Sequence, residues 1–83
     1  MKLLVFSVRD RATDQFGNPH FLINDGQAIR AFSDEVNSKS EDSYIAKHSD
    51  DFDLFKLGDF DTGTGLFSTG SPEQICIGKS VKL

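Results

Sequence analysis

One stretch near the middle of the chain constrains the fold more than any other. It runs from Lys47 to Asp61 and sets four large apolar residues between acidic ones: Phe52, Leu54, Phe55 and Leu57. Side chains alternate between the two faces of a strand, so the pattern predicts a strand from 52 to 60 with apolar groups on both faces. The stretch carries no recognisable catalytic set, so it indicates a fold rather than a chemistry.

The other apolar runs predict further strands and one helix. The first strand is expected at 3–8, the second at 21–23, the fourth from 66 until Ser71-Pro72 breaks it, and a fifth at 74–77. An amphipathic helix is predicted from Asp25 to Asn37, with Asn24 or Asp25 as its cap. The fold class is therefore α+β, a small antiparallel sheet of four to five strands with this helix packed on one face.

Size and charge set limits on function. The chain has 83 residues, which predicts one domain spanning 1–83. Its 13 acidic and 9 basic residues give a net charge of −4, which disfavours simple nonspecific binding of nucleic acid. One cysteine permits no internal disulfide and fits a reducing cytosol. No apolar run approaches the length of a membrane span, and we expect no membrane partner.

Two short motifs resemble chemical sites without completing them. Gly78-Lys79-Ser80 lacks the first glycine of a phosphate-binding loop, and the acidic run at 59–61 lacks the glycine and glutamate of a calcium loop. Cys76 is expected to be a packed thiol, and the carboxylates at 50, 51 and 53 an exposed rim. We therefore expect no enzyme, cofactor, metal or small-molecule substrate.

The basic residues are of more interest as a set. Arg9, Arg11, Arg30 and Lys47 could line a cationic groove, with Phe16 and Phe21 as aromatic platforms for single-stranded nucleic acid. The competing interpretation is scattered, solvated charge with the phenylalanines in the core. His48 follows Lys47 and is expected to anchor a loop or lie on the surface rather than to act as a base.

The predicted strands have more apolar faces than one helix can cover. The first and third strands carry large apolar residues on both faces, and a second apolar face does not normally stay exposed on a monomer. The sheet must curl into a barrel or meet a second copy of the chain. A symmetric homodimer is the favoured expectation.

Several segments, taken together, resemble a known family. They are Val8-Arg9-Asp10, the helix segment Ala28-Ile29-Arg30-Ala31-Phe32 with Asp34 through Asn37, and the run from Lys47-His48 through Asp51-Phe52, Leu54-Phe55 and Leu57-Gly58 to Phe60-Asp61. Their order and spacing over residues 2–61 resemble the small nonstructural protein of gokushovirus-like phages, the single-stranded DNA phages of the Microviridae. Ser49 stands where that family often has proline after the Lys-His pair.

The resemblance implies a protein made in the cytoplasm of an infected bacterium and absent from the mature virion shell. It implies a role in making or packaging viral single-stranded DNA and supplies no catalytic residues. Two hypotheses follow. The first is a nonenzymatic homodimer that binds single-stranded DNA or the replication and packaging proteins. The second is a module that binds a host or viral protein without contacting DNA. The candidate binding residues are Arg9, Arg11, Arg30, Lys47 and His48.

Overall fold

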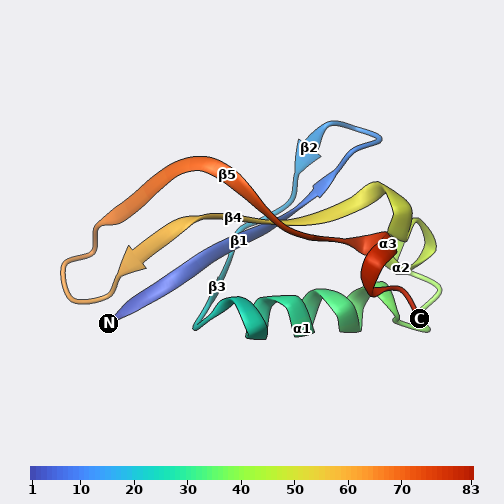
Figure 1. Cartoon of the computed structure of the whole chain (residues 1–83), viewed down its shortest axis with the longest axis horizontal. Helices are drawn as coiled ribbons and strands as arrows, with labels where there is room; N and C mark the ends of the chain where they lie inside the picture. The colour runs from blue at the N-terminus through green and yellow to red at the C-terminus, as the bar shows by residue number, and fades with distance from the viewer.

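The computed structural model describes the whole chain, residues 1–83, as an antiparallel sheet with one long helix and several short helical turns (Figure 1). In chain order the elements are β1 (Lys2–Asp10), β2 (Gln15–Phe16), β3 (His20–Leu22), α1 (Asp25–Val36), α2 (Tyr44–Lys47), the 3-10 turn η1 (Ser49–Asp51), β4 (Phe52–Asp61), β5 (Phe67–Ile77) and α3 (Gly78–Val81). None of these helices has the length and apolar character needed to cross a bilayer.

The sheet has five strands, all paired antiparallel. The strand order is β2-β1-β4-β5, and β3 pairs with β1 on the same side as β2. β1 and β4 are therefore the two interior strands, and β5 is an edge strand. Figure 1 shows α1 running beneath the sheet on one side only. The predicted α+β class, with four to five strands and one packed helix, is confirmed.

The ends of α1 follow the capping signals in the sequence. The Asn24 side chain accepts a hydrogen bond from the backbone N–H of Gln27 at 2.8 Å, and the Gln27 side chain accepts one from the N–H of Ile23 at 2.9 Å. The helix closes at Asn37, whose side-chain amide donates to the carbonyls of Ser33 and Val81, both at 2.9 Å. These bonds satisfy backbone groups that a helix leaves unpaired at its ends.

The core lies between α1 and the helix-facing side of the sheet. It consists of five buried apolar residues, namely Phe6, Ala28, Phe32, Val36 and Leu54. The three from α1 are spaced four residues apart, as a helix requires for one buried stripe, and the two strand residues come from neighbouring strands.

Close backbone packing shapes β4 at a glycine. Gly58 has a φ of +155°, and a Cβ at this position would overlap the carbonyl oxygen of Ser68 on β5. The β1–β4 register shifts between Val5 and Phe6, and the β4–β5 register shifts on both sides of Phe55. Such bulges bend a sheet and increase its twist.

Two sequence predictions about the C-terminal part need correction. The predicted end of a strand at Ser71-Pro72 is wrong, because β5 runs from Phe67 to Ile77; its pairing with β4 does shift there, since Lys56 lies opposite Glu73 and Gly58 opposite Thr69, which leaves 70–72 as a bulge. Proline is tolerated there because β5 is an edge strand whose outer N–H groups have no ladder partner. The short helix α3 was not predicted; it begins at Gly78, where a Cβ would overlap the carbonyl oxygen of Ser49.

The segment between α1 and β4 is more helical than expected. Residues 38–43, expected to be a loop, contain no helix or strand, but Ser43 then caps α2 by accepting from the N–H of Ala46 at 3.1 Å. Ile45 packs against the core as expected, whereas Tyr44 is exposed and stacks beside His48. The turn expected at Ser49 is η1.

The sheet stays open and does not curl into a barrel, so one face has no helix over it. We call this the outer face. Partners in the sheet register share a face. This places on the outer face Leu3, Val5, Ser7 and Arg9 of β1; Phe16 of β2; Phe21 of β3; Asp53, Phe55, Gly58 and Phe60 of β4; and Phe67, Thr69, Gln74 and Ile77 of β5. The second apolar face predicted from the sequence is therefore present and uncovered by this chain.

Candidate nucleic-acid interface

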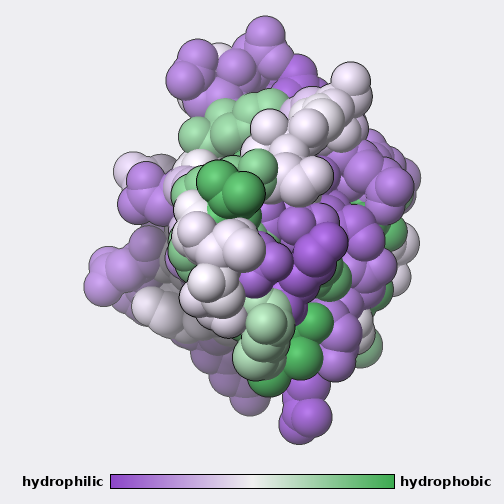
Figure 2. All heavy atoms as spheres, turned by 90° about the vertical axis from the view of Figure 1, so that its left-hand side faces the viewer, coloured by the Kyte–Doolittle hydropathy of each residue, from purple (hydrophilic) through white to green (hydrophobic).

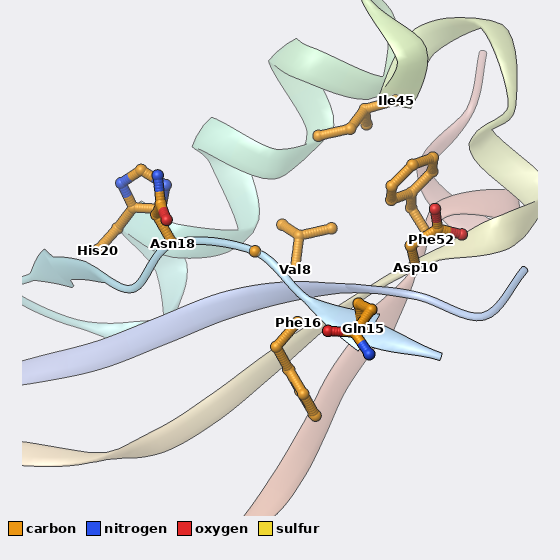
Figure 3. A pocket seen from close by; sticks show the side chains of 9 residues that line it. Val8, Asp10, Gln15, Phe16, Asn18, His20, Ile45 and Phe52 are labelled. Carbon is orange, nitrogen blue, oxygen red and sulfur yellow. The ribbon is translucent and has the colours of Figure 1, made fainter. Parts of the chain in front are cut away.

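One end of the outer face joins an arginine to aromatic rings. Arg9 of β1 lies opposite Phe16 of β2, and the Phe16 ring meets the Phe55 ring edge to face, with centroids 5.3 Å apart. Phe16 remains 42% exposed. Figure 3 shows its side chain pointing away from α1, on the opposite side of β1 from Val8. We call Arg9, Phe16 and Phe55 the platform.

The backbone beneath the platform is held firmly. Ser7 is buried, and its hydroxyl donates to the carbonyl of Gly17 at 2.8 Å, while the Gly17 N–H donates to the carbonyl of Val8 at 2.8 Å. These bonds tie the segment after β2 back to β1. The position of Phe16 is therefore fixed by neighbouring backbone rather than by a free loop.

Both arginines near the platform are already paired. Arg9 forms an ion pair with Asp14, a residue whose side chain is 80% exposed and whose φ is +57°. Arg11 pairs through Nε with Oδ2 of Asp53 at 3.1 Å and also donates to the carbonyl of Asp50. Exposed pairs of the Arg9–Asp14 kind are worth little and exchange readily, because water screens them.

Asp53 contradicts the prediction of an exposed acidic rim. Its side chain is only 4% exposed, and its second oxygen, Oδ1, has no hydrogen-bond partner. The register explains this burial, since Asp53 lies opposite Arg9 in the interior of the sheet. The sequence placed Asp53 among other carboxylates, and nothing in that cluster distinguished the buried one.

The other three candidate residues lie elsewhere. Arg30 is exposed on α1, in the helix layer on the opposite side of the sheet from the outer face. Lys47 ends α2 and lines a hollow of about 160 Å³ with Glu41, Asp42 and Tyr44. His48 follows Lys47, and its ring stacks on the Tyr44 ring with the centroids 6.3 Å apart. The structure thus brings Arg9 and Arg11 to one end of the sheet without joining all five residues in one stripe.

The helix side of the sheet contains an apolar cleft. Two adjoining hollows of about 330 Å³ each share Val8, His20 and Ile45, and Figure 3 shows Val8, Ile45 and Phe52 around the first of them. The charged residues that line them, Asp10 and Glu35, are both acidic. This cleft therefore offers no cation for a phosphate.

The reactive groups are dispersed. Burial raises the pKa of the Cys76 thiol, and the negative charge of Asp53 raises it further, so the thiolate is disfavoured. No group of three or more His, Cys, Asp or Glu residues is placed to hold a metal ion. In the β4–β5 turn, the Gly63 N–H lowers the pKa of Asp61 by donating to its carboxylate at 2.8 Å, which is a turn contact.

Comparison with known proteins places the chain among phage proteins. The family model described as "Phage ORF5 protein" matches residues 3–81, nearly the full length. The chain therefore belongs to the Phage ORF5 protein family. No curated protein and no solved structure matches it.

Proposed function

We propose that this phage protein is a nonenzymatic accessory protein of the gokushovirus-like Microviridae. In this proposal it works in the host bacterial cytoplasm as a homodimer that binds viral single-stranded DNA while that DNA is made or packaged. Membership of the Phage ORF5 family supports the phage role. The resemblance of the segments in residues 2–61 to the nonstructural protein of these phages supports the stage of infection.

The observation that carries the proposal is the half-exposed Phe16 ring beside Arg9 on an open sheet face. Aromatic rings on exposed sheet surfaces are platforms for unpaired bases, because every base has a π-face that can stack on them. Phe55 contacts the Phe16 ring edge to face and limits its motion. Stacking of a base on Phe16 therefore costs less conformational entropy.

The charges around the platform predict a particular kind of binding. A phosphate can displace Asp14 from Arg9, since Asp14 is exposed, whereas Arg11 stays beside the buried Asp53. One or two phosphate contacts then accompany the stacked bases. Binding is therefore governed by stacking, with a modest affinity and a small dependence on salt.

The test is fluorescence anisotropy of a labelled single-stranded oligonucleotide titrated with protein at low and moderate salt. Phe16→Ala is expected to weaken binding about tenfold or more, since stacking contributes about 1–3 kcal/mol per base. Arg30→Gln and Lys47→Gln are matched controls, because both residues are exposed cations outside the platform. Loss of binding in these controls with full binding by Phe16→Ala would move the DNA to the helix side.

A second candidate function is a module that binds a host or viral protein and never touches DNA. The specific observation in its favour is that Arg9 of the platform and the nearby Arg11 are both paired with aspartates, in a chain of net charge −4. Absence of any anisotropy change at low salt, where electrostatic attraction is strongest, would discard the DNA proposal in favour of this one.

A further inference from the structure

The outer face has a second aromatic group at its other end. Phe21 of β3, Phe60 of β4 and Phe67 of β5 lie in mutual contact, with ring centroids 4.8 to 6.1 Å apart. We call these three residues the Phe cluster. Phe21 is 44% exposed and Phe67 59% exposed, so the rings pack against each other while still facing solvent.

The side chains that the register places around the Phe cluster on the outer face carry no charge. The register sets Leu3 opposite Phe60, Val5 opposite Phe21 and Gly58, and Gly58 opposite Thr69. The arginines and aspartates of this face lie toward its other end. Between Val5 and Arg9 the distance along β1 is about 13 Å at the usual rise per residue.

The end of the molecule that carries the Phe cluster exposes further apolar side chains. Ile23 follows β3, Leu66 precedes Phe67, and Met1 accepts a hydrogen bond from Thr62 in the β4–β5 turn. Seen from this end, the surface shows hydrophobic areas between hydrophilic ones (Figure 2). Ile23 is 57% exposed and Leu66 68% exposed, so apolar side chains reach solvent at this end beyond the Phe cluster itself.

We infer that the Phe cluster is the contact between two copies of this chain, related by a two-fold axis. A stable interface buries about 800 Å² on each partner, so the apolar patch would supply its centre and the nearby threonines its rim. A two-fold contact places each surface against an identical one, so charged side chains in it would face like charges. For two chains of net charge −4, this repulsion is smallest where the contacting side chains are uncharged. Nucleic acid is the poorer occupant, since the cations at this end, the N-terminal ammonium of Met1 and the Lys2 side chain, both act on the Asp61 carboxylate.

This dimer contact deepens the proposed function. Only the consequence for DNA binding, given next, rests on that proposed function. A dimer that meets through the end of the molecule carrying the Phe cluster keeps both platforms open, because the molecule is 40 Å long and the platform lies toward the other end of the outer face. Two platforms per dimer would allow one strand of DNA to contact both, which raises the effective affinity without any new contact. Dimerisation itself requires no DNA.

The experiment is sedimentation equilibrium of the full chain without DNA. The wild type is expected to sediment as a dimer at tens of micromolar concentration. Phe67→Glu should sediment as a monomer, because a two-fold contact would set the two new carboxylates near each other. Phe16→Ala is the matched control; it should remain a dimer while losing DNA binding. Circular dichroism checks that each variant keeps the wild-type spectrum.

The outcomes separate the two proposals. A wild type that sediments as a monomer at these concentrations overturns the dimer, and so does a folded Phe67→Glu that remains dimeric. If Phe67→Glu does not fold, Thr69→Glu provides the same charge on the exposed part of the same face, and its failure to weaken the dimer overturns the inference. The loss of DNA binding in Phe16→Ala, measured in the same series, tests the platform and not the dimer contact.

Discussion

Nε of Arg11 lies 3.1 Å from Oδ2 of Asp53 and joins the end of β1 to the start of β4. The arginine is 49% exposed, but the carboxylate is almost fully buried and its other oxygen has no partner. Arg11 is therefore the group that compensates a buried negative charge. Its first role is structural, which leaves Arg9 as the more available cation of the platform.

We predict that Arg11→Ala destabilises the fold more than Arg9→Ala does. Removing one partner of a buried pair leaves an uncompensated charge, and solvent around the half-exposed Arg11 reduces that cost to about 2 kcal/mol. Arg9→Ala breaks a pair with an exposed aspartate and should cost less than about 1 kcal/mol. Urea unfolding followed by circular dichroism measures both. Equal losses in the two variants would contradict the structural role of Arg11.

Gly58→Ala is expected to destabilise the protein by about 2 kcal/mol or more. Its φ of +155° disfavours any side chain, and an added Cβ would overlap the Ser68 carbonyl. Gly70→Ala is the matched control on β5, because a Cβ there meets no atom within 4 Å. Thermal unfolding should show a large loss for the first variant and little change for the second. A tolerated Gly58→Ala would mean that β4 and β5 do not approach as described.

The Cys76 thiol gives a prediction about pH. Burial raises the pKa of Cys76 above its ordinary value of 9.0, and the Asp53 charge adds to the shift. The folded chain therefore keeps the thiol proton to higher pH than the unfolded chain does. The resulting stabilisation is fully present below about pH 9 and is lost as the pH rises through the folded-state pKa of Cys76. Unfolding free energy should fall more steeply above pH 9 for the wild type than for Cys76→Ala.

Alkylation provides an independent check on the same group. At pH 8, iodoacetamide should modify Cys76 severalfold more slowly in the folded protein than in urea, because the thiolate is the reactive form. Equal rates in the two states would show an exposed, unperturbed thiol.

Salt dependence tests how many phosphates the platform contacts. With Arg9 and at most Arg11 engaged, a plot of log K against log salt should have a slope between about −0.7 and −1.4. Arg9→Gln should reduce the magnitude of the slope by about 0.7 while retaining part of the affinity through Phe16. A slope much steeper than this would require cations outside the platform.

The sequence predicted the elements whose signals are local. The helix from Asp25 was predictable because Asn24, Gln27 and the buried stripe of Ala28, Phe32 and Val36 all lie within one stretch. The strand from Phe52 was predictable because its large apolar residues fall on both faces of a strand, within a short run set between acidic residues. The break assigned at Pro72 was wrong because its tolerance depends on β5 lying at the edge, a property of strand order and not of the strand itself.

The candidate site depended on information that no local pattern holds. The contact of the Phe16 ring with Phe55 joins β2 to β4, two strands that lie far apart in the chain. The burial of Asp53 has the same origin. The surplus of apolar faces was visible in the sequence, but its division into a platform with arginines and an uncharged Phe cluster became visible only with the register.

DNA binding on the outer face can be located by an amide NMR titration of the isotope-labelled protein with a short oligothymidine at low salt. We expect the shifts to concentrate at Arg9, Phe16 and Phe55, with little change along the exposed side of α1 around Arg30. No shifts at all, or shifts confined to α1 and α2, would contradict DNA binding on the outer face.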